Sequence, residues 1–286
     1  MNQKIEQKLK KVMFSYGKHY YYATLFFPKK IRNQVIILYA FVRRLDNIVD
    51  DFNLTVEEKI EKFKEWESEW LNVINGRESK FEELNLFYEI VKEKNIDMEY
   101  IEAFIRSMRY DLKPVRIKTF DELKEYIFGS AVVVGYFMLY IFDYFREELK
   151  EYAAALAEAM QLTNFIRDIK EDLRLNRIYI PEEIYSRFNI TEKDFFDFNS
   201  NKNFRDLIKY LIEINFNMYK KANQGIKILP SKVRFSVLYA SKLYSSILDE
   251  IKNNQYDVFS FSYKLRARRK FSSFLKTLLN FITNKY

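Results

Sequence analysis

Apolar residues recur along most of this chain at the three- and four-residue spacing of an amphipathic helix. The segment RNQVIILYAFVRR is typical: Val35, Leu38 and Val42 share one face, and apolar residues also occupy much of the remaining surface. Such a helix is expected to lie buried in a bundle. The pattern predicts helices over residues 30–51, 55–74, 81–94, 97–111, 119–143, 147–175, 202–228, 231–253 and 263–283.

Turn-forming residues are scarce in the sequence. The 286 residues include five glycines and four prolines, which favours long helices over a strand-rich fold. The clearest breaks, at residues 75–79 and 112–116, are too short to separate domains. Hydrophobic residues make up 48% of the chain, enough to fill a sizeable core. The sequence therefore predicts an all-α fold with a single domain over residues 1–286.

Composition also narrows the possible chemistry. Cysteine is absent and His19 is the single histidine, which excludes disulfides, thiolate catalysis and multi-histidine metal sites. Any bound metal is expected to have oxygen ligands, as Mg²⁺, Mn²⁺ and Ca²⁺ do. The N-terminus lacks the apolar stretch of a signal peptide, and the longest apolar run, residues 131–142, is shorter than the roughly 20 residues of a spanning helix. These features predict a cytoplasmic protein.

The segment LDNIVDD, residues 45–51, carries two carboxylates on one helical face. Asp46 and Asp50 are four residues apart, a spacing that brings like charges together. Four interpretations are open: a solvated acidic turn or, if the pair is buried, protonation, a structural ion pair with Arg43 one turn earlier, or a metal ion between the carboxylates. The apolar residues upstream favour burial, and a buried pair needs a counter-charge.

A second polar row lies in QLTNFIRDIKEDLRLNRIYIPEE, residues 161–183. Asn164, Asp168 and Asp172 follow i, i+4, i+8 spacing, with Gln161 one turn earlier. Taken alone, such a row is more often a solvated face. The preceding YAAALAEAM is rich in small residues, so neighbouring helices can pack closely and the row can point into a cavity. Two aspartate pairs on separate apolar helices favour a metal site.

The C-terminal segment concentrates the positive charge. Residues 258–286 contain no acid and hold seven of the eight net positive charges, on Lys264, Arg266, Arg268, Arg269, Lys270, Lys276 and Lys285. An apolar stripe in the same segment predicts a basic amphipathic helix at about 263–283, formed by Phe271, Phe274, Leu275, Leu278 and Ile282. This helix is either the last one of the bundle or one that lies on an anionic membrane surface. Nucleic-acid binding is not expected, because the remaining surface is nearly neutral and no recognised motif is present.

Two long segments resemble the squalene and phytoene synthases. They are YYYATLFFPKKIRNQVIILYAFVRRLDNIVDD and QLTNFIRDIKEDLRLNRIYIP, and weaker likeness covers SMRYDLKPVRIKTFDELKEYIFGSAVVVG and YSSILDEIKNNQYDVFS. The resemblance implies an isoprenoid-synthase helical bundle with a central cavity, and two aspartate-rich motifs that face each other across its mouth. It also implies an enzyme that condenses two prenyl diphosphates head to head.

The resemblance assigns roles to residues at matching motif positions. Mg²⁺, with Mn²⁺ as a possible substitute, is implied at Asp46, Asp50, Asn164, Asp168 and Asp172. The four aspartates, together with Arg43 and Tyr244, are implied to be catalytic. Substrate contacts are implied for Tyr39, Gln161, Arg167, Arg177 and Tyr179, and for His19, which stands where many relatives have serine. Asn47 replaces a frequent second aspartate of the first motif.

The expected product is inferred from the amino-acid sequences of two motifs. YYYATLFFP and SAVVVG are more similar to phytoene synthases, so the expected reaction joins two geranylgeranyl diphosphates through a cyclopropylcarbinyl diphosphate to phytoene. The alternative is a squalene or dehydrosqualene synthase that uses farnesyl diphosphate, with NADPH needed only for squalene. Tyr22, Phe26, Val133 and Phe137 are predicted to line the prenyl tunnel or, alternatively, to pack in the core. Val132 stands where many relatives have glycine, which predicts a narrower cavity.

A non-catalytic interpretation belongs to a different class of function. Some members of this fold are assembly or scaffold proteins, and they typically have eroded aspartate motifs. Both motifs are complete here at the ligand positions, which favours an enzyme. A lipophilic substrate also favours peripheral contact with a membrane through the basic C-terminal helix. The sequence does not predict an oligomeric state.

Overall fold

The computed structural model describes residues 3–260 and 267–283, with side chains for residues 3–260 and 274–283. The predicted start of the last helix at residue 263 lies outside this range, as do Lys264, Arg266 and Lys285. The first half of the chain forms α1 (Gln3–Tyr16), α2 (Lys18–Thr24), α3 (Lys29–Val49), α4 (Val56–Ile74), α5 (Glu82–Lys94), α6 (Met98–Tyr110), β1 (Val115–Arg116), α7 (Phe120–Ile127), η1 (Phe128–Val132) and α8 (Val133–Ile141). The second half forms α9 (Glu147–Arg167), α10 (Ile169–Arg174), β2 (Arg177–Ile178), α11 (Glu182–Tyr185), η2 (Ser186–Phe188), α12 (Glu192–Phe196), α13 (Lys202–Ile228), α14 (Ser231–Asn253) and α15 (Ala267–Thr283).

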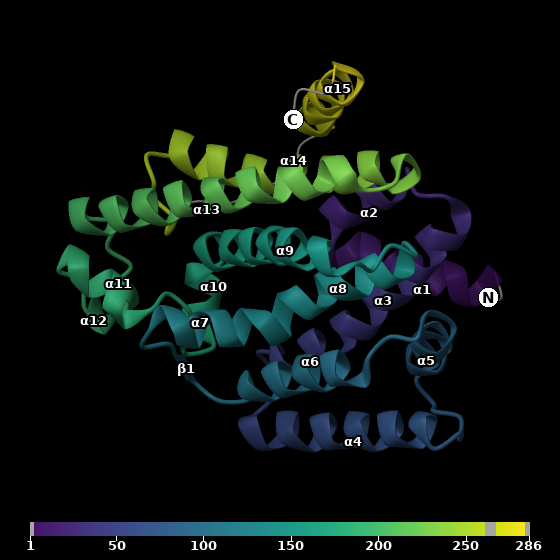
Figure 1. Cartoon of the computed structure of the whole chain (residues 1–286). Helices are drawn as coiled ribbons and strands as arrows, with labels where there is room; N and C mark the ends of the chain where they lie inside the picture. The colour runs from purple at the N-terminus through teal and green to yellow at the C-terminus, as the bar shows by residue number, and fades with distance from the viewer. Residues whose placement is uncertain (1–2, 261–266, 284–286) are drawn as a thin grey trace.

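The predicted all-α fold is confirmed, and α9 lies in the middle of the bundle (Figure 1). Helix α13 packs along α9, while α8 and α14 also contact it. Helices α4, α5 and α6 form the opposite side of the molecule, and α15 lies at the periphery against α14. The short N-terminal helices α1 and α2, which the apolar pattern did not predict, pack against α3 and α14 respectively.

Local capping explains where several helices begin and end. Thr55 and Glu58 form a reciprocal capping box at the start of α4, and the Asp97 side chain caps the N-terminus of α6. Asn95 ends α5 in the left-handed conformation, with φ of 52°. These caps fall at the polar breaks of the sequence, which is why the predicted helix boundaries there agree with the structure to within two residues.

The predicted helix at 119–143 is three consecutive elements, because a π-helical turn, η1, separates α7 from α8. A π turn inserts an extra residue and changes which side chains share a face. Within it, Gly129 packs closely against α6: a Cβ at this position would lie 2.5 Å from the Ala103 carbonyl oxygen. Only glycine permits this approach.

The same stretch, Phe120–Ile141, is the one helical segment among the described residues that is long and apolar enough to span a membrane. Half of its most apolar window is buried inside the bundle.

The predicted helix at 147–175 bends at Asp168. Helix α9 ends at Arg167, Asp168 has φ of −102° and ψ of 11°, and α10 begins at Ile169. The polar row therefore does not follow one straight helix. Asp172 lies beyond the bend, on α10.

Two short parallel strands, which the sequence did not predict, connect distant parts of the chain. β1 follows α6 and β2 follows α10, with Val115 paired to Arg177 and Arg116 to Ile178. This pairing brings the residues around Arg177 next to the end of α6.

Buried apolar residues form two large clusters. One is built largely from α3 to α6 and α8, where Phe41 stacks on Phe87 with ring centroids 4.0 Å apart. The other is built largely from α7 and α9 to α14. Partly buried aromatic residues such as Tyr20 and Tyr100 contact both clusters.

Candidate active site

A cavity of about 450 Å³ is lined by residues from both clusters. Its size is within the range of roughly 300–1,000 Å³ that small-molecule sites usually have. Most of the wall is apolar and comes from α2, α3, η1, α8, α9, α13 and α14. The polar side chains of the lining include Asp46, Asp50, Asn164, Asp168, Asp172, Arg43, Arg167 and Arg177. An apolar chamber with a cluster of charges can hold a long hydrocarbon that carries an anionic head group.

The lining differs from the sequence prediction. Tyr22, Phe26, Val133 and Phe137 do not line the cavity. Val133 and Phe137 are fully buried in the core, while Phe26 lies on the outside, where its ring stacks on Phe274 of α15. The extra residue of the π turn turns Ala131, Val134 and Met138 toward the cavity instead. On α2 and the turn after it, the lining residues are Tyr20, Ala23, Thr24 and Phe27.

Val132, which was predicted to narrow the cavity, does not line it. It lies in the π turn, 3% exposed, and packs in the second cluster. The cavity wall beside it is formed by Ser130 and Ala131, whose side chains are small.

The first aspartate pair lies at the end of α3. Asp46 Oδ2 is 3.7 Å from Arg43 Nη1, and Arg43 Nε also donates to Asn47 Oδ1 at 2.8 Å. Burial, followed by the charge of Asp50, raises the pKa of Asp46 to about 7. The Arg43 ion pair considered from the sequence is thus present, but it does not cancel the penalty of two close carboxylates.

The second pair lies across the bend after α9. The Arg167 guanidinium makes a bidentate ion pair with Asp168 through Nε and Nη2. Burial alone would lower the pKa of Arg167, but the Asp168 carboxylate outweighs it and raises that pKa. Asp172 makes no ion pair with another described residue. Burial and the charge of Asp168 raise the pKa of Asp172 well above its usual value.

A buried hydrogen-bonded link sets the rotation of α9. Asn215 Nδ2 of α13 donates to Thr163 Oγ1 at 3.0 Å, and the Tyr219 hydroxyl lies 3.0 Å from the same oxygen. With Thr163 held toward α13, its neighbour Asn164 faces the cavity. Asn164 Nδ2 donates to Gln161 Oε1 at 3.3 Å, while Asn164 Oδ1 is buried without a hydrogen-bond partner.

The remaining residues with predicted roles gather around the same site. Tyr39, Gln161, Arg167, Arg177, Tyr179 and Tyr244 line the cavity, together with Arg43. His19 does not line it, but its ring lies 5.3 Å from that of Tyr244. Burial and the nearby Arg167 charge lower the pKa of His19 to about 4, so its imidazole is neutral at pH 7.

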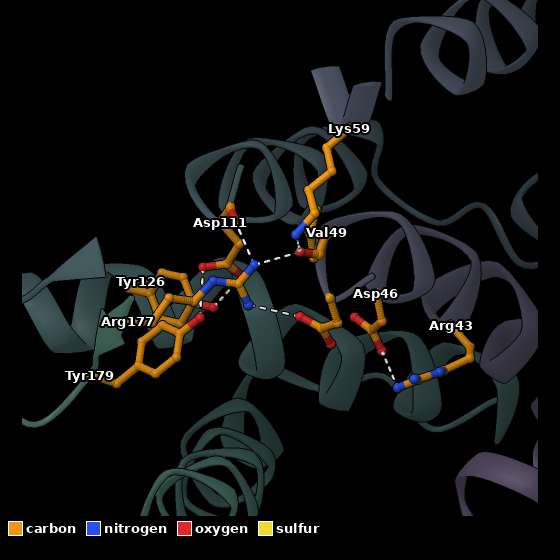
Figure 2. Close-up of polar contacts among 9 residues, drawn as sticks. Arg43, Asp46, Val49, Lys59, Asp111, Tyr126, Arg177 and Tyr179 are labelled. Carbon is orange, nitrogen blue, oxygen red and sulfur yellow. Dashed lines mark hydrogen bonds and ion pairs between the residues drawn. The ribbon is translucent and has the colours of Figure 1, made fainter. Parts of the chain in front are cut away.

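Arg177 is not a free side chain, because protein groups already accept its hydrogen bonds. It is 4% exposed, and its guanidinium donates to Asp50 Oδ1, to the Val49 carbonyl and to the Asp111 carbonyl, each at 2.7 Å (Figure 2). Tyr179, also predicted to contact substrate, donates its hydroxyl to Asp111 Oδ1 at 2.9 Å.

Three residues of this network were missed at the sequence level: Lys59, Asp111 and Tyr126 (Figure 2). The Lys59 ammonium donates to the Val49 carbonyl at 2.8 Å, and the Tyr126 hydroxyl donates to Asp111 Oδ2 at 2.6 Å. Burial raises the pKa of Asp111 to about 6, against the opposing charge of Arg177. The one available signal was Asp111 at the polar break after α6, where a carboxylate is unremarkable.

The donor set fits a divalent cation that prefers oxygen. No three carboxylate or histidine side chains of the described residues converge closely enough to hold an ion by themselves. Mg²⁺ does not need such a cage, since it usually keeps several waters and takes one or two carboxylates together with substrate phosphates. The orphaned Asn164 oxygen and the raised pKa values of Asp46 and Asp172 both indicate sites where a cation would stabilise the protein groups.

The fold and this site define a class of enzyme that handles long apolar substrates with an anionic head. The sequence matches the family model described as squalene/phytoene synthase over residues 14–272, and the chain belongs to that family. It is therefore a prenyl transferase that condenses prenyl substrates head to head.

Individual relatives agree with this assignment. The chain is 31% identical over 264 residues to a phytoene synthase of Arthrospira platensis, covering 88% of this chain and 85% of the relative. It is 29% identical to a 15-cis-phytoene synthase of a Synechocystis species, covering 88% and 77%. Among solved structures, a dehydrosqualene synthase in complex with a ligand has the same fold, with a TM-score of 0.88 at 22% identity and 98% coverage of both chains.

The pKa of His19 can be measured directly, because no other histidine contributes to the spectrum. A native pKa near 4 means that the unfolded state binds the proton more tightly. Lowering the pH from 6.5 toward 4 therefore removes stability that is fully present above pH 6.5. NMR titration of the imidazole should give the low value in the native protein and about 6.5 in denaturant. A native pKa at or above 6.5 would contradict the buried, Arg167-facing position.

Proposed function

We propose that this enzyme converts two geranylgeranyl diphosphates to phytoene. The observation that carries the reaction type is the cavity itself, whose apolar walls meet two aspartate pairs and several arginines at one polar end. Relatives named phytoene synthase, at about 30% identity, favour this product over the alternatives. The reaction forms a cyclopropylcarbinyl diphosphate and then rearranges it, releasing both diphosphates and two protons without a reductant.

Diphosphate would bind at the polar end of the cavity. Arg43 and Arg167 each pair with an aspartate, so both guanidinium groups are held in place before substrate binds. Asp46, Asp50, Asn164, Asp168 and Asp172 would hold Mg²⁺, or Mn²⁺ in its place. When bound, this metal neutralises the charge that develops on the departing diphosphate. Gln161, Tyr39 and Tyr244 supply further polar groups on the same wall.

The apolar walls would protect the cationic intermediates. Aromatic side chains such as Tyr20, Phe27 and Phe165 line the cavity and offer π-electron density to a cation without a strong nucleophile. Small residues, including Ala131, Gly135 and others on α9 and α13, leave room for the hydrocarbon chains. Exclusion of water by such walls prevents hydrolysis of the cation.

A second candidate reaction uses farnesyl diphosphate to make dehydrosqualene, or squalene with NADPH as the reductant. The structural likeness to a dehydrosqualene synthase supports keeping this alternative. The residues around the diphosphate serve either reaction, so they do not discriminate between the two. The intact aspartate pairs favour an enzyme over the non-catalytic scaffold alternative.

The product can be identified in one assay. Purified enzyme supplied with geranylgeranyl diphosphate and Mg²⁺ should form phytoene in the absence of NADPH, as measured by chromatography of the extracted hydrocarbons. A parallel reaction with farnesyl diphosphate, with and without NADPH, provides the comparison. If the enzyme forms product from farnesyl diphosphate and none from geranylgeranyl diphosphate, the choice of substrate is reversed.

Metal removal tests the role of the aspartates. EDTA should abolish turnover, and Asp50→Asn or Asp168→Asn should lower kcat by at least about 100-fold, because charge stabilisation at the leaving group is lost. Asp51→Asn is a matched control, since Asp51 caps its own turn through Asn53 and does not line the cavity. The assignment fails if Asp50→Asn and Asp51→Asn retain the same activity.

We also propose that the enzyme works at an anionic membrane surface through α15. Phe274 and Phe281 of this helix pack on Phe235 of α14, which accounts for one face. Leu275, Leu279 and Ile282 follow i, i+4, i+7 spacing on another face and are 41%, 63% and 69% exposed. The helix would thus serve both roles considered from the sequence, with one face in the bundle and the other on lipid.

Vesicle sedimentation tests the membrane role. Leu279→Glu with Ile282→Glu should weaken binding to anionic vesicles, and added salt should weaken binding of the unaltered protein, because salt screens surface charge over about 8–10 Å. Leu71→Glu is the control, since Leu71 is 56% exposed on α4, at the opposite side of the molecule. Equal binding by both variants at all salt concentrations would argue against the proposal.

A further inference from the structure

Lys59 is a buried cation that the proposed reaction does not use. It lies on α4, is 8% exposed, and does not line the cavity. Its ammonium forms no ion pair with a described carboxylate, and its one hydrogen bond goes to the Val49 carbonyl at 2.8 Å. A buried ammonium without an ion pair is costly, so this lysine needs an explanation beyond packing.

The carbonyl that Lys59 binds belongs to the last residue of α3. Carbonyls at a helix C-terminus lack intrahelical partners and carry partial negative charge. The Val49 carbonyl accepts a second hydrogen bond, from Arg177 Nη2 at 2.7 Å. Two cations therefore converge on one backbone atom directly before Asp50.

Arg177 extends this contact to the Asp50 side chain and to α6. Its Nη1 donates to Asp50 Oδ1, and its Nη2 also donates to the Asp111 carbonyl. Asp111 is itself 5% exposed, with one carboxylate oxygen bound by Tyr126 and the other by Tyr179 (Figure 2). The contact between Arg177 and Asp111 is thus through the backbone, while the nearby Asp111 charge helps to raise the pKa of Arg177. Segments far apart in the sequence thus meet at the end of α3.

We propose that Lys59 and Asp111 are positioning residues that act through the Val49 carbonyl and Arg177 to fix the direction of the Asp50 carboxylate. Lys59 and Arg177 hold the backbone that carries Asp50, while Asp111 holds Arg177 through its backbone carbonyl and its nearby charge. This inference rests on the proposed function, because it takes Asp50 as a metal ligand.

The proposal differs from a purely structural role in one measurable way. Groups that orient a metal ligand typically change metal affinity or activity by about 10–100-fold when removed. A residue that only stabilises the fold lowers the free energy of unfolding and leaves the affinity of the folded protein unchanged. Metal binding to the folded protein therefore separates the two roles.

The experiment measures Mn²⁺ binding to the full-length protein by EPR in the presence of inorganic diphosphate. Lys59→Met removes the ammonium and keeps the apolar stem, and Asp111→Asn removes the charge with little change in size. Both should raise the Kd for Mn²⁺ by about 10-fold or more. Lys59→Arg, which keeps a cation, should recover most of the affinity that Lys59→Met loses.

Glu83→Gln is the matched control. Glu83 is a buried carboxylate, 3% exposed, that binds Arg44 on another face of α3 and does not line the cavity. The Glu83→Gln substitution should lower the free energy of unfolding without changing the Kd for Mn²⁺. An unchanged Kd in Lys59→Met would overturn the proposal, and this variant decides the matter if Asp111→Asn does not fold.

A parallel Asp50→Asn variant separates this inference from the proposed function. Loss of Mn²⁺ binding in Asp50→Asn, with normal binding in Lys59→Met, would refute the positioning role and leave the metal site in place. Normal binding in Asp50→Asn would refute the metal site and the positioning role that depends on it.

Discussion

The mutual repulsion of Asp46, Asp50, Asp168 and Asp172 at one cavity is the constraint on which the rest of the site depends. Carboxylates removed from water and placed near one another cannot all ionise without compensation. Three of them have an arginine partner, from Arg43, Arg177 or Arg167. The raised pKa values of Asp46 and Asp172 indicate that this compensation is incomplete. The site is therefore suited to bind additional positive charge.

Each arginine is also tied to a different part of the bundle. Arg43 lies on the same helix as its aspartate, whereas Arg177 comes from β2 and joins the ends of α3 and α6. The small strand pair between β1 and β2 is what brings Arg177 to this place. A fold that is otherwise helical thus uses its only described strands to organise the charged end of the cavity.

The apolar part of the cavity depends on how the helices pack rather than on charge. Its walls are formed where two apolar clusters meet without filling the space between them. Close packing of α9, α8 and α13 relies on alanine and glycine, as at Gly225, where a Cβ would lie 2.2 Å from that of Tyr152. The charged residues are common to both candidate reactions, and the walls are the part of the cavity in which a difference in chain length would matter. Family membership therefore fixes the reaction type more firmly than the product.

The sequence by itself determined the helical fold, most helix boundaries and the aspartate pairs, because these depend on local periodicity and capping. Asp46 and Asp50 share a face through the 3.6-residue repeat alone. The tertiary structure decided which wall residues line the cavity, since the π turn at η1 and the bend at Asp168 change the helical phase in ways that no regular pattern records. It also decided the roles of Lys59 and Asp111, which reach the end of α3 from 10 and 62 residues away along the chain. A lysine on an amphipathic helix and an aspartate in a turn look solvent-exposed in sequence, and only the packing of other helices around them reveals that they are buried.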